Sequence, residues 1–196
     1  MADAMGNTIT VVSGLPRSGT SLMMQMLDAG GMDAMTDGHR TADDDNPRGY
    51  YELENVKRLR ADNSWVADAQ GKVIKVIHLL LRELPENYEY RVVFMRRYIE
   101  EVLSSQMKML ERQGTKGADL TAEKLGAIFQ KQLQDVDAWL ADRPQFKVFD
   151  VKYHELIADP QPIAEAVNTF LGGELNTQAM VEKVDPALYR QRKSGS

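Results

Sequence analysis

The chain has 196 residues, of which 43% are hydrophobic and 27% are charged, and its formal net charge is −5. This size and composition predict one domain over residues 1–196 with a sizeable core, and the acidic balance argues against a nucleic-acid partner, which usually selects a basic surface. The chain contains no cysteine, so disulfides, thiolate nucleophiles and cysteine-bound metals are excluded.

The amino terminus has neither the basic region nor the apolar stretch of a secretion signal, and no apolar run is long enough to span a bilayer. We therefore expect a cytoplasmic protein with no membrane partner. Nothing in the composition selects an oligomeric state.

Short apolar runs predict strands at residues 8–13, 72–77, 91–95 and 146–151, separated by helical or polar stretches. This alternation predicts an α/β protein: a P-loop-type, three-layer fold whose mostly parallel central sheet is flanked by helices. Its ligand is expected outside the carboxyl ends of the strands. Thr121 is expected to cap a helix that runs to about Asp142, and Asp159-Pro160 to begin one that ends at Leu171.

The stretch from Ser13 to Ser21 keeps the G-x-x-x-x-G-K-[ST] frame of a phosphate-binding loop, but Thr20 replaces the lysine. The preceding strand and the following helix would aim the backbone N–H groups of residues 17–21 at a phosphate-like group. Because the lysine that neutralises a triphosphate is missing, a less charged group such as a 5′-phosphosulfate fits better. The alternative is an ordinary strand-to-helix turn that binds nothing. The candidate binding residues are Pro16, Arg17, Ser18, Gly19, Thr20 and Ser21.

The segment Gly14 to Leu22 resembles the 5′-phosphosulfate loop of sulfotransferases that use 3′-phosphoadenosine 5′-phosphosulfate (PAPS). The resemblance implies PAPS as co-substrate, no required metal, and transfer of a sulfuryl group to a hydroxyl or amine of a small-molecule or carbohydrate-like acceptor. Arg17 is then the cation expected to stabilise the departing phosphate oxygen.

Two later segments agree with this resemblance. Arg96 ends a predicted strand, and Ser104 follows eight positions later in a helix expected from Tyr98 to Gln113. That spacing is similar to the family's 3′-phosphate clamp, and Tyr153 matches the tyrosine that the family places near adenine. The alternatives are a surface arginine, a tolerated helical serine and a tyrosine at the rim of a strand.

The irregular stretch of about residues 30–63 is expected to bind the acceptor. Family members take the acceptor's proton with a glutamate after the first helix or with a histidine in a lysine–x–histidine pattern. Lys75 and His78 are one position further apart, and they would face opposite sides of a strand unless it ends before residue 78. Solvated carboxylates and packing histidines are the alternatives. The candidate bases are Glu52, Asp37, His39 and His78.

A basic tail of about residues 185–196 includes Arg190 and Arg192, which could fold over the nucleotide in place of the family's glycine-rich basic loop, which this chain lacks. A frayed tail is the alternative.

Two rival functions stay open. A nucleotide kinase or triphosphatase is supported by the loop and by Asp150, which ends a predicted strand as a magnesium-binding aspartate would. The missing lysine at position 20 weighs against it. The second rival function is that of a non-enzymatic PAPS-binding protein that has lost its catalytic base.

Overall fold

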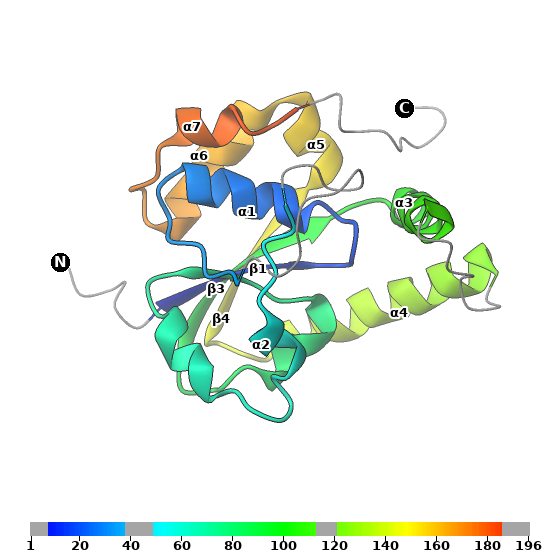
Figure 1. Ribbon diagram of the computed structural model, residues 1–196, viewed down its shortest axis with the longest axis horizontal. Helices are drawn as coiled ribbons and strands as arrows, with labels where there is room; N and C mark the ends of the chain where they lie inside the picture. Colours follow the sequence, from blue (N-terminus) through cyan, green and yellow to red (C-terminus); the bar gives the residue numbers. More distant parts are fainter. Residues whose placement is uncertain (1–7, 38–48, 113–120, 186–196) are drawn as a thin grey trace.

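The computed structural model describes residues 8–37, 49–112 and 121–185. Within these residues, four parallel strands form one sheet, which lies between helices (Figure 1). The strands are β1 (Thr8–Gly14), β2 (Val73–Lys75), β3 (Glu89–Arg96) and β4 (Phe146–Lys152), in the order β2-β1-β3-β4. All four lie where the sequence predicts strands, and the predicted α/β fold class is confirmed. His39, Arg190 and Arg192 lie outside the described residues.

The central strands are buried on both faces, which is typical of parallel sheets covered by helices. Successive side chains point to opposite faces, so Val92 and Phe94 of β3 join one core cluster while Val93 and Met95 join the other. The side chains of β1 alternate in the same way, since Val11 belongs to the first core cluster and Val12 to the second. The apolar residues of these strands thus form one core layer on each face of the sheet.

Helices cover both faces of the sheet in Figure 1. One layer contains α1 (Thr20–Ala29), α5 (Tyr153–Ala158), α6 (Pro160–Leu171) and α7 (Thr177–Val181), whose buried residues share a cluster with Val12 and Met95. The opposite layer contains α2 (Glu54–Lys57), α4 (Ala122–Ala141) and the 3-10 helices Ser64–Ala69 and His78–Glu83. α3 (Ile99–Arg112) packs against α4 beyond the carboxyl end of β3.

The predicted boundaries of α4 and α6 are confirmed. Thr121 caps α4, and its Oγ1 accepts a hydrogen bond from the backbone N–H of Lys124 at 3.3 Å. α6 begins at Pro160 and ends before Gly172. Among the described helices, none has the length and apolarity that crossing a membrane requires.

The strand order places a topological switch point between β1 and β3, because the chain passes from β1 to β2 on one side and then crosses to β3 on the other side of β1. Ligands of open α/β sheets bind outside the carboxyl ends of the strands at such a point. The loop after β1, Lys75 at the end of β2 and Arg96 at the end of β3 therefore share one edge of the sheet.

Candidate functional site

The loop between β1 and α1 depends on two glycines. Gly14 has a φ of 147°, and a Cβ atom there would lie 2.6 Å from Ser18 Oγ and 2.7 Å from the carbonyl oxygen of Met95. Gly19 has a φ of 101°, and a Cβ atom there would lie 2.4 Å from a ring carbon of Tyr153. The tight loop is therefore possible only with glycine at both positions.

The loop presents backbone donors at the start of α1. The N–H groups of Gly19, Thr20 and Ser21 donate to no acceptor within the described part of the chain. Helical hydrogen bonding begins with the N–H of Met23, which donates to the carbonyl oxygen of Gly19 at 3.1 Å. Unpaired N–H groups at a helix amino terminus carry partial positive charge. This geometry suits an anion such as a phosphate or sulfate group.

The predicted loop residues differ in their exposure. Pro16 is exposed, whereas Ser18 is buried and its hydroxyl oxygen has no partner among the described residues. Arg17 is half-buried and adopts a left-handed backbone conformation, with a φ of 69°. Its Nε donates to Ser105 Oγ at 3.0 Å, and its carbonyl oxygen accepts a hydrogen bond from Arg97 Nη1 at 3.1 Å.

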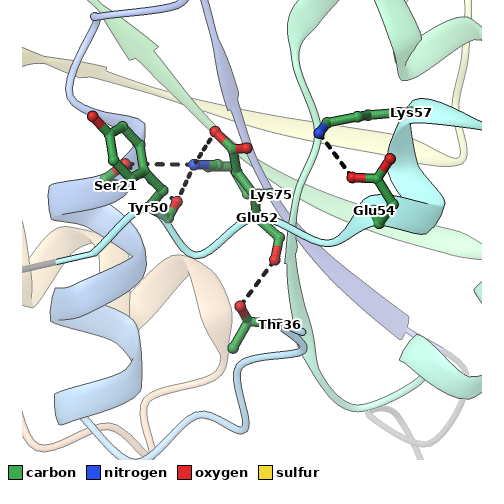
Figure 2. Close-up of polar contacts among 7 residues, drawn as sticks. All are labelled: Ser21, Thr36, Tyr50, Glu52, Glu54, Lys57 and Lys75. Atoms are coloured by element: carbon green, nitrogen blue, oxygen red, sulfur yellow. Dashed lines mark hydrogen bonds and ion pairs between the residues drawn. The ribbon is translucent and has the colours of Figure 1, made fainter. Parts of the chain in front are cut away.

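Lys75, at the carboxyl end of β2, points at the start of α1 (Figure 2). Its ammonium group donates to the carbonyl oxygen of Tyr50 and to Ser21 Oγ, the latter at 3.4 Å. The carboxylate of Glu52 lies 3.9 Å from Lys75 Nζ. A cation and a carboxylate thus meet beside the loop's open N–H groups. From the sequence, Lys75 is predicted only as half of a lysine–x–histidine pattern, although its position at the end of a predicted strand is a signal for this edge of the sheet.

The segment that carries Glu52 is tied to α1. Tyr51 has a φ of 51°, and its hydroxyl donates to Asp28 Oδ2 at 2.8 Å. Burial first, then the hydrogen bond and charge of Asp28, raise the pKa of Tyr51 to about 12. Ser21 Oγ also donates to the carbonyl oxygen of Tyr50 at 3.3 Å. These contacts bring Glu52, one of the predicted bases, to the loop.

Asp37, another predicted base, has a different setting. Its Oδ2 accepts the backbone N–H of Glu54 at the start of α2, and its own N–H donates to the carbonyl oxygen of Glu52 at 3.3 Å. Thr36 Oγ1 donates to the same carbonyl oxygen at 2.9 Å, as Figure 2 shows. Asp37 thus supports the backbone around Glu52.

His78 lies beneath the loop. β2 ends at Lys75 and a 3-10 helix begins at His78. The alternation of side chains along a strand therefore does not force the two residues to opposite sides of the sheet. The imidazole is 2% exposed; Nδ1 lies 3.2 Å from the carbonyl oxygen of Gly14 and Nε2 lies 3.0 Å from Gln132 Oε1. Burial, opposed by hydrogen bonds to Gln132 and Gly14, lowers the pKa of His78. Both ring nitrogens therefore have protein partners.

The predicted 3′-phosphate residues lie apart from the loop's contacts. Arg96 makes a bidentate ion pair with Asp137, with N–O distances of 2.6 and 3.2 Å, and Arg96 Nε donates to Asp150 Oδ1 at 2.9 Å. The guanidinium also lies over the ring of Phe94. Ser104 lines an open groove of about 770 Å³ between α3 and α4.

Tyr153, the predicted adenine contact, is the first residue of α5 and is 7% exposed. Its ring lies beneath Gly19, and the guanidinium of Arg97 stacks over it at 4.5 Å from the centroid. Burial raises the pKa of the Tyr153 hydroxyl, against the lowering influence of Arg97. The tyrosine is therefore part of the floor of the loop.

A protein-family model described as the sulfotransferase family matches residues 32–177. The chain belongs to the sulfotransferase family. The match begins after the glycine loop, so the loop's geometry is a separate observation from the family match. No curated protein matches the chain.

Solved structures agree on the sulfotransferase fold. The sulfotransferase domain of the olefin synthase from Synechococcus PCC 7002 is 18% identical, with 97% of this chain and 90% of that chain covered and a TM-score of 0.58. The sulfotransferase STF1 from Mycobacterium tuberculosis H37Rv is 21% identical, with 93% and 73% covered and a TM-score of 0.59. At these identities the likeness establishes the P-loop-type α/β fold.

Proposed function

We propose that the protein transfers a sulfuryl group from PAPS to a hydroxyl or amine of a small-molecule or carbohydrate-like acceptor. The observation that carries the proposal is the set of open N–H groups at Gly19, Thr20 and Ser21, with the Lys75–Glu52 pair beside them. Open N–H groups at a helix start suit the 5′ end of the donor. A carboxylate beside that end suits an acceptor whose proton must be removed.

The reaction assigns one task to each group. The acceptor's oxygen or nitrogen forms a bond to sulfur, and the bond between sulfur and the 5′-phosphate oxygen breaks. Glu52 takes the acceptor's proton. Lys75, Arg17 and the loop's N–H groups stabilise the negative charge that collects on the departing phosphate oxygen. The support for Glu52 over the other predicted bases is its position 3.9 Å from Lys75 Nζ.

For the other end of the donor we retain the sequence-based assignment of the 3′-phosphate to Arg96 and Ser104. Arg96 would have to exchange Asp137 and Asp150 for phosphate, which offers the same bidentate oxygen geometry. Tyr153 as an adenine contact, and Arg190 and Arg192 as closing residues, stay predictions from the sequence. So do the single domain and the cytoplasmic location.

Calorimetry with 3′-phosphoadenosine 5′-phosphate, the product of the reaction, tests the proposal. We expect tight binding without magnesium, and a loss of about tenfold or more in Arg96→Ala, because a charge-assisted pair is removed. Arg91→Ala is the control: it removes an arginine from β3 five residues earlier, away from the carboxyl edge, and affinity should stay within about twofold. Preference for magnesium-ATP would contradict the proposal.

The structure gives little support to the kinase or triphosphatase function. Asp150, which could have held magnesium, accepts a hydrogen bond from Arg96 instead. The binding-protein alternative predicts that 3′-phosphoadenosine 5′-phosphate binds but that no sulfuryl group is transferred from labelled PAPS to any phenol, alcohol, amine or sugar in a panel.

A further inference from the structure

Exposed apolar side chains gather just beyond the end of β2. Ile77 is 40% exposed and Leu79 is 44% exposed, although both are large and apolar. They flank His78, which is buried beneath the loop between β1 and α1. A single apolar side chain at a surface is ordinary, but neighbouring ones that form a patch are often part of a binding site.

Ile77 lies on the same side of the extended chain as Lys75. The chain stays extended beyond β2, because the N–H of Val76 donates to the carbonyl oxygen of Val12 at 3.0 Å and Ile77 has extended backbone angles. Side chains alternate along such a segment, so Val76 points into the opposite core while Lys75 and Ile77 share a face. On that face Lys75 reaches the carbonyl oxygen of Tyr50 (Figure 2). Ile77 is therefore the next side chain beyond the cation of the candidate site.

α4 adds a third exposed apolar side chain to this region. Nε2 of His78 lies 3.0 Å from Gln132 Oε1, and Ile128 precedes Gln132 by one helical turn on the same flank of α4. Ile128 is 39% exposed. Among the described residues, six large apolar side chains are exposed, and half of them thus surround His78. Their concentration at one place distinguishes them from scattered surface residues.

These three residues, Ile77, Leu79 and Ile128, form an apolar patch at the edge of the sheet where the candidate site lies. Nδ1 of His78, at the centre of the patch, lies 3.2 Å from the carbonyl oxygen of Gly14, where the loop begins. Residues 76–81 include no charged side chain other than a histidine whose two ring nitrogens already have protein partners. The patch therefore offers apolar contact, and few side-chain hydrogen bonds, to a molecule at the site.

This surface suits one of the two acceptor classes that the proposed function leaves open. The hydroxyl groups of a sugar need hydrogen-bond partners, and contact with apolar side chains would leave them unpaired. An alkyl or aryl group gains free energy from the same contact, because it leaves water.

We propose that the acceptor is an alcohol, phenol or amine with an alkyl or aryl body, which the patch binds. Ile77, Leu79 and Ile128 hold that body, while the reacting oxygen or nitrogen lies beside Lys75 and Glu52. The inference rests on the proposed function, and it narrows the acceptor from small molecules and carbohydrates to apolar small molecules.

Matched acceptors test the class of substrate. Cyclohexylmethanol and glucose both have a six-membered ring with a primary hydroxyl group attached, but the glucose ring carries further hydroxyl groups. With labelled PAPS, kcat/KM for cyclohexylmethanol should exceed that for glucose by about tenfold or more. From 1-propanol to 1-octanol, kcat/KM should rise about 2- to 4-fold per methylene until the patch is covered. Faster transfer to glucose, or rates independent of chain length, would overturn the inference and leave the proposed function supported.

Ile77→Thr tests the patch itself, because it keeps a β-branched side chain but removes its apolar end. KM for 1-octanol should rise about 3- to 10-fold, while kcat and the affinity for 3′-phosphoadenosine 5′-phosphate stay within about twofold. Val148→Thr is the matched control. Val148 is 38% exposed and lies in β4, at the opposite edge of the sheet from β2, so its substitution should change none of these quantities beyond about twofold. Equal effects of the two substitutions would overturn the inference.

Leu79→Ser is a second, independent variant. The ratio of kcat/KM for 1-octanol to that for 1-propanol should fall about 3- to 10-fold, because only the longer chain extends over the patch. An unchanged ratio in both Ile77→Thr and Leu79→Ser would overturn the inference. A wild type that binds 3′-phosphoadenosine 5′-phosphate but transfers to no alcohol, phenol, amine or sugar would contradict the proposed function and the inference with it.

Discussion

The phosphate loop and the segment around Glu52 meet at one edge of the sheet, but different interactions hold them. The loop, residues 14–19, is shaped by left-handed backbone at Gly14, Arg17 and Gly19, and by its direct attachment to β1 and α1. The segment of residues 50–54 is held by side chains of other elements, including Lys75, Asp28 and Asp37. The proposed donor side of the site is therefore held by the backbone, and the proposed acceptor side is held by side-chain contacts.

This difference predicts that changes on the two sides have different effects. Alterations of the loop should impair nucleotide binding and stability together. Alterations of the segment around Glu52 should change transfer while nucleotide binding persists.

The largest effect is expected from Glu52→Gln, which keeps the shape of the side chain but removes the proposed base. Sulfuryl transfer should fall about 10²- to 10⁴-fold, while affinity for 3′-phosphoadenosine 5′-phosphate stays within about twofold. Turnover of labelled PAPS and calorimetry measure the two quantities. The control is Glu54→Gln, which removes a carboxylate that pairs with Lys57 at the surface. An unchanged rate in Glu52→Gln would exclude Glu52 as the base.

Gly19→Ala should have the next largest effect, on the donor side. The new Cβ would lie 2.4 Å from the Tyr153 ring, in a backbone conformation that alanine disfavours. We expect a loss of about 2–4 kcal/mol in the free energy of unfolding and at least tenfold weaker bisphosphate binding.

Gly71→Ala is the matched control for Gly19→Ala. Gly71 has a φ of 72°, but no atom lies within 4 Å of its missing Cβ. Its substitution should cost about 1–2 kcal/mol through the backbone alone and leave nucleotide affinity unchanged. Urea denaturation and calorimetry report both. Equal losses of nucleotide affinity in the two variants would show that the contact with Tyr153 has no part in shaping the loop.

Tyr51→Phe should have a smaller effect, confined to the acceptor side. The variant removes the hydrogen bond from the Tyr51 hydroxyl to Asp28, which costs about 0.5–1.5 kcal/mol of stability. Because the same segment carries Glu52, transfer should slow about 3- to 10-fold without a change in nucleotide affinity. Steady-state kinetics and calorimetry measure the two. Weaker nucleotide binding would show that the two sides are not separate.

The smallest effect concerns pH and His78. The native pKa of His78 lies below its ordinary value of 6.5, so the unfolded chain takes up a proton before the native protein does. His78 therefore adds no pH dependence above pH 6.5, and stability falls as the pH drops from 6.5 toward the native pKa. His78→Asn should reduce this fall, measured by urea denaturation at pH 7.5 and 5.5. A pH dependence unchanged by the substitution would contradict the buried neutral state.

The sequence predicted what depends on local pattern. The four strands, the Thr121 cap and the loop from Gly14 to Ser21 follow from short apolar runs, cap chemistry and glycine spacing. Each of these signals is contained within a few residues, so no knowledge of tertiary contacts is needed.

The sequence could not show which of two adjacent residues faces the loop. Arg97 and Ser105 have the same spacing as Arg96 and Ser104, and only the exit angle of β3 and the rotation of α3 separate the pairs. Lys75 reaches the carbonyl oxygen of Tyr50, 25 residues earlier in the chain, through a contact between the end of β2 and the irregular segment before α2. Such choices depend on packing between distant elements.

Titration of the ¹⁵N-labelled protein with 3′-phosphoadenosine 5′-phosphate, without magnesium, tests most directly whether the loop binds the 5′ end of the donor. We predict large downfield shifts of the Gly19, Thr20 and Ser21 amide protons, and much smaller shifts of the same protons with adenosine 3′-monophosphate. Bisphosphate binding that leaves these three amides unchanged would contradict the assignment of the loop.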